Sequence, residues 1–327
     1  MVDRDFIQNL WIEKVPTNEK INIYINIPFC YSQCRYCLYQ GNLNSYEYRA
    51  KYFEDYLIPN ISYYTDLFKR YEINCIYIGG GTPNTMPIEY FIRLKYIMGN
   101  LWDKAKTRII EINPAYADIA WLKELTELNF TLITFGIQTF DKDTLIRMKR
   151  RYVSPDDVHK LINVIRDNNI TKYISLDIMA YIQSYSISDL TNYLTQDIER
   201  ALVLDVDFIT VYPELNLINV DNKAAQTFAN FIKAYKYDGC YSDISEQLEV
   251  NPRLIVRFIK DKYDYNFFYN NILNYYADDF PTATINVIGF GDLNSKHEVF
   301  SYSPDRFLYI ERYQENKIPE YDILYYK

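Results

Sequence analysis

The stretch that decides the fold is INIYINIPFCYSQCRYC, residues 21–37. Its first seven residues alternate isoleucine with polar or aromatic side chains, a pattern that predicts a β-strand with two different faces. Three cysteines with C-x3-C-x2-C spacing follow at once. Parallel α/β folds build their sites on the loops that follow the C-terminal ends of strands. The stretch therefore predicts a parallel α/β protein with a reactive loop after this strand.

Strands and helices alternate through the first two thirds of the chain. The residue patterns predict strands at residues 21–27, 75–78, 108–112, 130–136, 172–179 and 208–212. They predict intervening helices at residues 47–70, 87–101, 117–128, 141–149, 154–167 and 188–204, the last with Ser188 as its N-cap. Six successive βα units imply a parallel sheet with right-handed crossovers. Since the motifs described below follow strand C-terminal ends, we expect an open partial (β/α)6 TIM-like barrel.

The regular alternation of strands and helices ends after about residue 217. The sequence there predicts helices at residues 222–237, 252–263 and 304–314, and a β-like stretch at residues 282–288. We therefore expect three parts along the chain. These are an N-terminal extension (residues 1–19), the barrel (residues 20–217) and a smaller C-terminal α+β region (residues 218–327) packed over the barrel mouth.

Composition and charge exclude several classes of protein. Apolar residues make up 49% of the chain and charged residues 24%, near the globular average, which excludes a disordered chain. No run of about 18 apolar residues is present, so no transmembrane helix is expected. The 43 acidic and 35 basic side chains give a net charge of −8, and the basic ones are scattered, so we expect neither a nucleic-acid nor a membrane partner. Residues 1–16 lack the basic start and apolar core of a secretory signal, which makes the cytoplasm the expected compartment.

Three of the five cysteines, Cys30, Cys34 and Cys37, lie within eight residues. In a reducing compartment this clustering points to metal ligation, and two histidines leave little material for a histidine zinc site or a Ser-His-Asp triad. Three thiolates can hold three irons of a [4Fe-4S] cluster and leave one iron open to another ligand. The alternatives are three ordinary apolar cysteines or a structural zinc site missing a ligand. Cys75 and Cys240 stand alone, and we expect the cluster not to need them, while Cys240 stays a candidate for a later acceptor role.

A second motif, GGGTP at residues 79–83, follows the strand predicted at residues 75–78. The chain has only 9 glycines, so three in a row indicate a close approach of the backbone to another group. The backbone carbonyls and the Thr82 hydroxyl can accept hydrogen bonds from an ammonium group. A tight turn is the alternative interpretation.

At the cysteine loop the sequence resembles the radical SAM superfamily, whose open iron is chelated by the amine and carboxylate of S-adenosylmethionine. Reduction of the cluster then injects an electron into the sulfonium and releases a 5′-deoxyadenosyl radical. Together, IPFC and GGGTP resemble, more narrowly, the oxygen-independent coproporphyrinogen III oxidases and their HemN-like relatives. The resemblance continues in order through EINP (111–114), GIQTF (136–140), Arg150, LDI (176–178) and TVYPEL (210–215), and more weakly through IGFG (288–291), Tyr309 and IP (318–319).

This resemblance implies a role for each matching position. The adenine would contact Tyr36 and Leu215, the methionine amine Gly80, Gly81 and Thr82, and the methionine carboxylate Arg150. Polar groups of ribose or methionine would contact Gln138 and Asp177. A second S-adenosylmethionine or the substrate would contact Tyr24 and Glu111. Without the resemblance, Arg150 reads as part of a solvated basic run at a helix end, and Glu111 as a cap or salt bridge at a strand end. Asp177 differs, because a carboxylate in an apolar strand needs a partner in any case.

Two departures separate the chain from the oxidases. A further cysteine that the oxidases carry two residues after the triad is Tyr39 here, and their Gly-Leu-Pro-Gly after the fifth-strand aspartate is replaced by AYIQ at residues 180–183. The chain is also shorter than the oxidases. The resemblance therefore supports the cofactor machinery better than the oxidase activity.

Three functions from different classes follow. The first is a radical SAM enzyme that modifies a small molecule or a peptide by hydrogen abstraction, or by methyl or methylene transfer with a second S-adenosylmethionine. The second is a tetrapyrrole enzyme or a haem-handling protein, either like coproporphyrinogen oxidase or a haem chaperone. The third is a non-enzymatic iron–sulfur or electron-transfer module. We favour the first, with a [4Fe-4S] cluster, one or two molecules of S-adenosylmethionine and an electron donor such as flavodoxin or ferredoxin, because simple electron carriers use four protein ligands.

Overall fold

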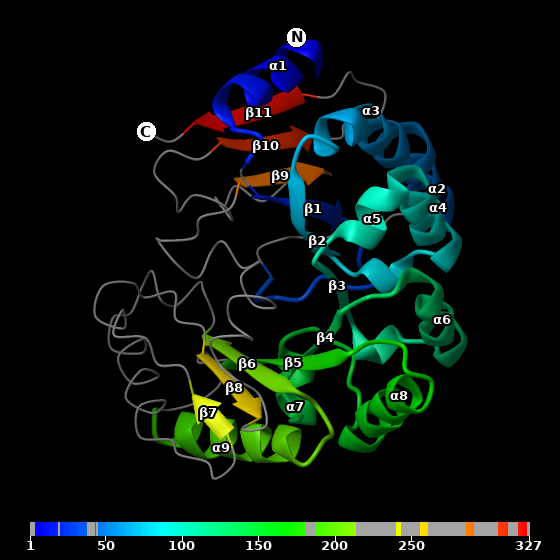
Figure 1. Cartoon of the computed structure of the whole chain (residues 1–327). Helices are drawn as coiled ribbons and strands as arrows, with labels where there is room; N and C mark the ends of the chain where they lie inside the picture. The colour runs from blue at the N-terminus through cyan, green and yellow to red at the C-terminus, as the bar shows by residue number, and fades with distance from the viewer. Residues whose placement is uncertain are drawn as a thin grey trace.

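The computed structural model describes residues 4–18, 20–37, 43, 45–180, 187–213, 240–242, 256–260, 286–290, 307–312 and 320–325. The described strands form one open sheet with the order β11-β10-β9-β1-β2-β3-β4-β5-β6-β8-β7 (Figure 1). Six neighbouring strands run parallel: β1 (Lys20–Ile27), β2 (Glu72–Gly80), β3 (Thr107–Ile112), β4 (Leu132–Gln138), β5 (Tyr173–Ala180) and β6 (Phe208–Pro213). The predicted open (β/α)6 architecture is confirmed.

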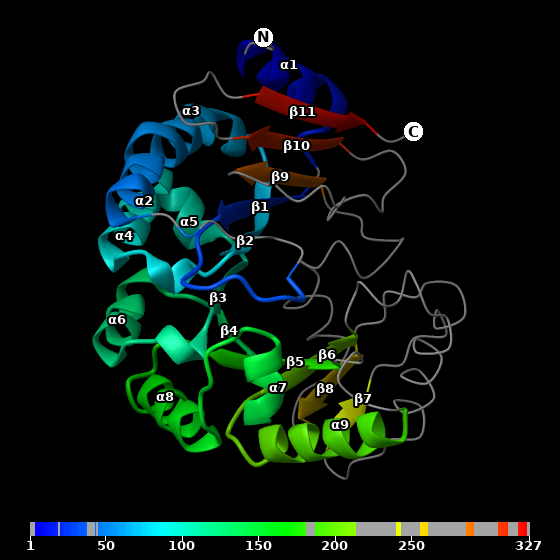
Figure 2. The same cartoon turned by 180° about the vertical axis from the view of Figure 1, so that it is seen from behind.

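Helices connect the parallel strands and flank the curved sheet (Figure 1 and Figure 2). The helix predicted at residues 47–70 is present as α2 (Tyr46–Tyr52), the π-helical turn η1 (Phe53–Leu57) and α3 (Ile58–Phe68). The later connections contain η2 (Pro83–Thr85), α4 (Ile88–Met98), α5 (Asn100–Lys104), η3 (Pro114–Tyr116), α6 (Ile119–Glu124), η4 (Leu125–Leu128), α7 (Lys142–Arg147), α8 (Pro155–Asp167) and α9 (Ile187–Leu202). Since α9 begins at Ile187, the predicted N-cap Ser188 lies inside its first turn.

The two faces of β1 differ in the way that its alternating sequence predicts. All four isoleucines, at positions 21, 23, 25 and 27, are completely buried and join the main hydrophobic core with residues of the covering helices. The residues between them are Asn22, Tyr24 and Asn26, which are also buried but point to the other face. Asn22 accepts a hydrogen bond of 2.9 Å from Asn74 of β2, which satisfies part of this buried polarity. The inner face of the sheet is therefore the polar one.

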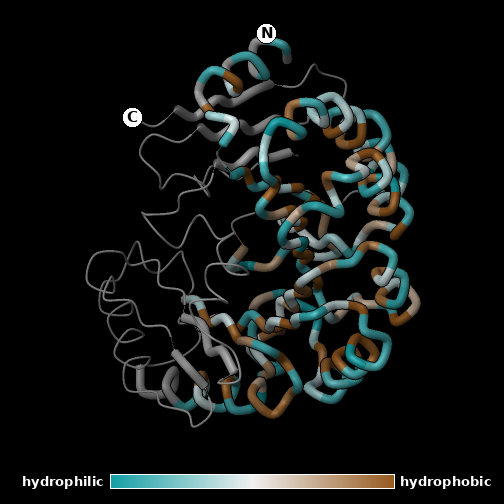
Figure 3. The backbone as a smooth tube through the Cα atoms, viewed as in Figure 1, coloured by the Kyte–Doolittle hydropathy of each residue, from teal (hydrophilic) through white to brown (hydrophobic). Residues whose placement is uncertain are grey.

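Hydropathy along the backbone follows the same division. In Figure 3 the outer helices alternate hydrophobic and hydrophilic segments along their length. The helix α8 illustrates this, since Val158, Leu161, Ile162 and Ile165 are buried on one face, while exposed positions on the other face include charged side chains. Burial of one helix face against the sheet supplies the main stabilisation of such a layer.

Strands from the C-terminal part of the chain extend the sheet at both edges. On one side β9 (Asn286–Phe290) pairs parallel with β1, followed by β10 (Phe307–Arg312) and β11 (Glu320–Tyr325). On the other side β8 (Val256–Lys260) pairs antiparallel with β6, and β7 (Cys240–Ser242) pairs with β8. The predicted β-like stretch at residues 282–288 is thus present, shifted to β9. The boundary at residue 217 stays a prediction.

Two predicted helices of this part are wrong. Residues 256–260 and 307–312, expected in helices at 252–263 and 304–314, form β8 and β10 instead. Both segments, VRFIK and FLYIER, are rich in β-branched and aromatic side chains, and each finds an unpaired strand edge of the parallel sheet. The helix predicted at residues 222–237 lies outside the described residues.

The N-terminal segment packs onto the core through α1 (Arg4–Lys14). Trp11 is completely buried, and its ring meets that of Tyr71 edge to face with a centroid distance of 6.5 Å. The Tyr71 hydroxyl donates a hydrogen bond of 3.1 Å to the carbonyl of Val15. Within the part of the chain that the structure describes, no helix has the length and apolar character needed to span a bilayer.

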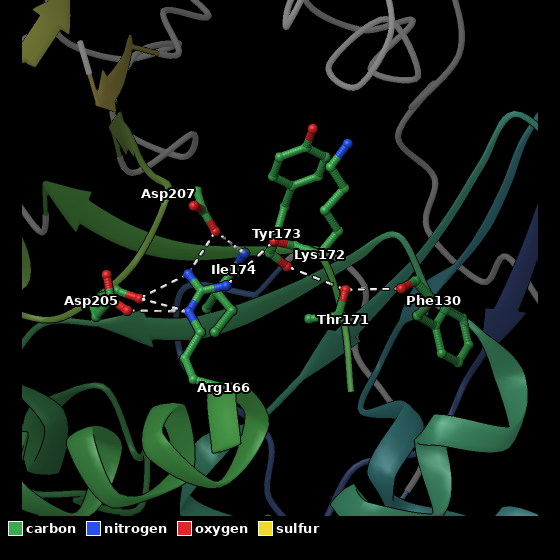
Figure 4. Close-up of polar contacts among 8 residues, drawn as sticks. All are labelled: Phe130, Arg166, Thr171, Lys172, Tyr173, Ile174, Asp205 and Asp207. Carbon is green, nitrogen blue, oxygen red and sulfur yellow. Dashed lines mark hydrogen bonds and ion pairs between the residues drawn. The ribbon is translucent and has the colours of Figure 1, made fainter. Parts of the chain in front are cut away.

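A buried carboxylate ties the start of β6 to β5 and α8 (Figure 4). Asp207 Oδ2 accepts hydrogen bonds of 2.7 Å from the backbone N–H of Ile174 and of 2.7 Å from Arg166 Nη2. The same guanidinium donates to the carbonyl oxygens of Asp205 and Lys172. Because Asp207 is almost wholly buried, these contacts replace the water that its charge has lost. This network fixes the end of the sheet opposite to the cysteine loop.

Candidate functional site

The cysteine loop and the glycine motif are hydrogen-bonded to each other. The N–H of Gly81 donates to the carbonyl of Ile27 over 2.9 Å, and the N–H of Thr82 to that of Phe29 over 2.7 Å. The hydroxyl of Thr82 then donates to Cys30 Sγ over 3.5 Å. The pairing of β1 with β2 therefore continues past the strand ends and holds the start of the cysteine loop.

This continuation explains two of the three consecutive glycines. A Cβ on Gly81 would lie 2.6 Å from the carbonyl oxygen of Phe29 and 2.8 Å from that of Ile27, which no side chain tolerates. Gly80 has φ of 101°, in the region that favours glycine. The close approach predicted from the sequence is thus an approach of backbone to backbone. Contacts of Gly80, Gly81 and Thr82 with a methionine amine stay a prediction.

Arg150 turns into the site instead of lying in solvent. Its Nη1 donates to the Tyr36 hydroxyl over 3.1 Å and to Cys34 Sγ over 3.7 Å, and its Nη2 donates to the carbonyl of Gly136. The turn is made by the residue before it, Lys149, which has φ of 55° at the end of α7. Burial acts to lower the pKa of Arg150, but Tyr36 and Cys34 outweigh burial and the pKa is raised, so the guanidinium stays charged.

The three thiols lie close enough to influence one another. Burial raises the pKa of Cys30 to about 11; the hydrogen bond from Thr82 opposes this, while Cys37 and Cys34 add to it. The loop is closed by a backbone hydrogen bond of 3.2 Å from Cys37 to Cys34. Three sulfur donors on one loop, two of them accepting hydrogen bonds from Thr82 and Arg150, fit the ligand set of a [4Fe-4S] cluster with one open iron.

Among the described residues, the three cysteines included, no three His, Cys, Asp or Glu side chains are arranged to hold one metal ion. Cys75 is completely buried in β2, and burial raises the pKa of its thiol to about 12. Its expected dispensability stays a prediction. The backbone of Cys240 lies in β7, and its role also stays a prediction.

Gln138 and Tyr212 lie near Arg150 in the site. Gln138 ends β4 with φ of 72°, and the Tyr212 hydroxyl donates to its Oε1. Tyr212 and Tyr36 both pack on a small cluster of buried side chains: Leu145, Met148 and Met179. Sequence reasoning missed Tyr212, although it lies in the TVYPEL segment that resembles the family. Asp177 faces Gly136 across the pairing of β4 with β5, and Leu215 lies outside the described residues.

Tyr24 and Glu111 are linked through a residue that the sequence did not single out. The Tyr77 hydroxyl donates to Glu111 Oε1, and the Tyr77 ring stacks on that of Tyr24 with centroids 5.5 Å apart and planes inclined by 22°. Burial raises the pKa of Glu111, while hydrogen bonds from Tyr77 and the backbone of Gly80 oppose the rise. Among the described residues, Glu111 has hydrogen-bond partners and no basic side chain at ion-pair distance. It belongs to a polar row across β1, β2 and β3.

The segment after β4 is anchored by a buried carboxylate of α9. Asp197 Oδ1 accepts a hydrogen bond of 3.0 Å from the N–H of Phe140, two residues after Gln138, and Arg200 lies 4.0 Å away. Burial raises the pKa of Asp197 to about 6, with hydrogen bonds from Thr139 and Phe140 opposing it. The position of Gln138 in the site therefore depends partly on this contact.

This carboxyl makes stability depend on pH. Because the folded pKa exceeds the unfolded one, the stabilisation is fully present below about pH 4 and is lost as pH rises through 6. We expect the unfolding free energy of the wild type, relative to Asp197→Asn, to fall by about 2 kcal/mol between about pH 4 and pH 7. Urea unfolding at several pH values measures this. A difference that stays constant across this range would contradict the prediction.

Comparisons with known proteins point to the family that the motifs resemble. Residues 24–195, which are 172 of the 327 residues, match the radical SAM superfamily. The heme chaperone HemW of Buchnera aphidicola subsp. Schizaphis graminum is 29% identical over 172 residues, covering 52% of this chain and 45% of that protein. The oxygen-independent coproporphyrinogen III oxidase of Escherichia coli is 25% identical over 171 residues, covering 51% of this chain and 37% of the oxidase.

A solved structure shows the same fold. The coproporphyrinogen III oxidase HemN of Escherichia coli, a radical SAM enzyme, superposes with a TM-score of 0.67 at 15% identity, covering 88% of this chain and 66% of that one. The chain spans about half the length, or less, of the curated relatives that it matches.

Proposed function

Because the chain belongs to the radical SAM superfamily, we propose that it holds a [4Fe-4S] cluster on Cys30, Cys34 and Cys37 and cleaves S-adenosylmethionine reductively to modify a small molecule or a peptide. One observation carries this proposal. Hydrogen bonds from two other parts of the chain, donated by Thr82 after β2 and by Arg150 after α7, converge on the sulfurs of the cysteine loop. Such bonds orient metal ligands and tune the potential of iron–sulfur clusters.

When bound, the cluster would supply one electron to the sulfonium of S-adenosylmethionine. The residues around it would bind and orient that molecule. A guanidinium fork suits the two oxygens of a carboxylate, and the oxygen acceptors that Arg150 now has, on Tyr36 and Gly136, are uncharged in their ordinary states. A methionine carboxylate would therefore compete well for Arg150. Gly80, Gly81 and Thr82 would meet the amine, Gln138 and Asp177 the polar groups of ribose or methionine, and Tyr36 and Leu215 the adenine.

The polar row of Tyr24, Tyr77 and Glu111 would serve the other half of the reaction. It lies on the inner face of the sheet, and its carboxylate is held in place by the Tyr77 hydroxyl. Such a fixed acceptor suits an amine or hydroxyl of the substrate, or of a second S-adenosylmethionine used for methyl or methylene transfer. An electron-donating protein such as a flavodoxin or ferredoxin would complete the system.

Haem handling is the second candidate, since relatives of this chain are named heme chaperone and coproporphyrinogen III oxidase. Two features weaken the oxidase form of this candidate. The further cysteine of the oxidases is Tyr39 here, and their glycine-rich loop after the fifth-strand aspartate is AYIQ at residues 180–183.

Anaerobic reconstitution tests the proposal. We expect about four irons per chain, and slow release of 5′-deoxyadenosine and methionine when the reduced protein meets S-adenosylmethionine alone. Cys34→Ala should lose the intact cluster and this activity, because it removes one of three ligands. The matched control Cys75→Ala should keep both.

The products separate the remaining possibilities. S-adenosylhomocysteine formed together with 5′-deoxyadenosine would indicate methyl transfer, whereas 5′-deoxyadenosine alone would indicate abstraction, rearrangement or decarboxylation. Haem binding without turnover would support the chaperone. An intact cluster that releases no nucleoside under strongly reducing conditions would overturn the proposal and leave an electron-transfer module.

A further inference from the structure

A row of two guanidinium groups and two tyrosine rings borders the cysteine loop. The Cζ of Arg49 lies 5.5 Å from the ring centre of Tyr31, and the rings of Tyr31 and Tyr116 are 4.6 Å apart. The Cζ of Arg151 lies 5.2 Å from the ring centre of Tyr116. We call these four residues the Arg–Tyr row. They come from α2, the cysteine loop, η3 and the segment after α7, so four separate parts of the chain meet here.

The row is open to solvent, and its arginines form no close ion pair with a described carboxylate. Tyr31 is 48% exposed and Arg151 is exposed, while Arg49 and Tyr116 are half-buried. Within the described part of the chain, no carboxylate lies within salt-bridge distance of Arg49 or Arg151. Stacking on a ring uses the flat face of a guanidinium and leaves its in-plane N–H groups for other acceptors. In Arg49, Nη1 donates to the carbonyl of Thr85 over 3.1 Å.

Exposed basic side chains lie beside the row although the whole chain is acidic. Residues 147–151 carry four basic side chains, of which Arg150 turns into the site and Arg147 lies 3.9 Å from Asp141, while Lys149 and Arg151 are exposed. Residues 28–46 contain Arg35 and no acidic residue, and Glu47 follows them. The net charge of the chain is −8. Exposed positive charge beside the cysteine loop can steer an acidic partner to this place.

The row lies next to the groups that would hold the cluster. Tyr31 directly follows Cys30, and Arg151 directly follows Arg150, which donates to Cys34 Sγ. A protein bound on the row would therefore cover the outside of the cysteine loop. Arginine and tyrosine are also the residue types enriched where proteins bind each other.

We propose that the Arg–Tyr row is the docking surface for an acidic protein that carries a one-electron cofactor. This inference rests on the proposed function, which requires one electron from outside the chain for each molecule of S-adenosylmethionine cleaved. The donor is oxidised by one electron and the cluster is reduced by one, with no covalent bond made between the two proteins.

The test compares two reductants with the reconstituted full chain. Reduced flavodoxin, an acidic protein donor, should drive 5′-deoxyadenosine release at least about tenfold more slowly in Arg49→Glu/Arg151→Glu than in the wild type at low salt. Reduced methyl viologen, a small molecule, should drive both proteins at rates within about twofold, because it needs no docking surface. For the wild type, the flavodoxin-driven rate should fall as ionic strength rises from about 0.01 M to about 0.15 M.

The matched control is Lys104→Glu/Lys172→Glu, which changes the net charge by the same amount. These lysines precede β3 and β5 and lie at the opposite end of the parallel strands, so flavodoxin-driven turnover should stay near the wild-type rate. An equal loss in this control, or an unchanged flavodoxin-driven rate in the arginine variant, would overturn the proposal. A rise in substrate KM with both reductants would make the row a substrate site instead.

A direct measurement of flavodoxin binding tests the docking surface independently of S-adenosylmethionine cleavage. If the arginine variant loses turnover with both reductants, titration with oxidised flavodoxin decides: Arg151→Ala should bind it several-fold more weakly than the wild type, and equal binding would refute docking at the row. If the wild type releases no nucleoside even with methyl viologen, the proposed function fails, whereas the same titration still tests the surface.

Discussion

Gly81→Ala is expected to abolish the iron–sulfur cluster and every activity that depends on it. The added Cβ would lie 2.6 Å, 2.8 Å and 2.9 Å from three backbone atoms of Phe29 and Ile27, none of which can rotate away. Relief requires the cysteine loop to move off the end of β2, which breaks the two backbone hydrogen bonds of Gly81 and Thr82. Cys30 would then lose the position that Thr82 now supports. Iron content after reconstitution and 5′-deoxyadenosine release measure the effect.

Gly99→Ala is the matched control for this substitution. Gly99 ends α4 with φ of 52° and ψ of −129°, so alanine there is strained by about 1 to 3 kcal/mol, but its nearest neighbour beyond the adjacent residues is 3.9 Å away. We expect slightly lower thermal stability with full iron content. If Gly81→Ala also bound about four irons and cleaved S-adenosylmethionine at the wild-type rate, the backbone contact between the two loops would be unimportant for the site.

Asp207→Ala is expected to lower the free energy of unfolding by about 3 to 5 kcal/mol. The substitution removes the acceptor of the buried Ile174 N–H and one of the two carboxylates that pair with Arg166, whose Nε stays 3.4 Å from Asp205 Oδ2. Asp207→Asn should lose less, because an amide oxygen can still accept from Ile174. Urea unfolding with a secondary-structure signal measures both variants.

A surface ion pair provides the comparison for Asp207. Lys160 and Asp157 lie 3.1 Å apart on α8, and both side chains are more than half exposed. Lys160→Ala should change the unfolding free energy by no more than about 0.5 kcal/mol. A loss below about 1 kcal/mol for Asp207→Ala would mean that water reaches this carboxylate and that burial does not determine its contribution.

The elements that could be predicted from sequence are those whose signal is local. The alternation of β1, the C-x3-C-x2-C loop and the glycine run each combine a pattern with a strand end, and the structure places them side by side. The place of Arg150 in the site could be predicted only from the spacing seen in the family. A basic run after a helix otherwise looks exposed to solvent, since the positive φ of Lys149, which turns Arg150 inward, is not visible in the sequence.

The errors arise where the outcome depends on distant partners. The segments of β8 and β10 are apolar enough for a helix or a strand, and only the free edges at β6 and β9 decide between them. Tyr77 and Tyr212 were hidden by composition, since 35 tyrosines made any single one look unremarkable. Their roles follow from Glu111 and Gln138, which lie 34 and 74 residues away in sequence.

The pairing of β1 with β9 has a consequence for the order of events during synthesis. Ile21 pairs with Asn286, so the strand that leads into the cysteine loop is flanked on one side by residues made 265 positions later. Contacts of such sequence separation form slowly, because a long loop must close before they contribute. A ribosome-bound chain that has reached only β6 presents β1 with a bare edge. The strand that leads into the cysteine loop therefore gains its second neighbour only after the last part of the chain has been made.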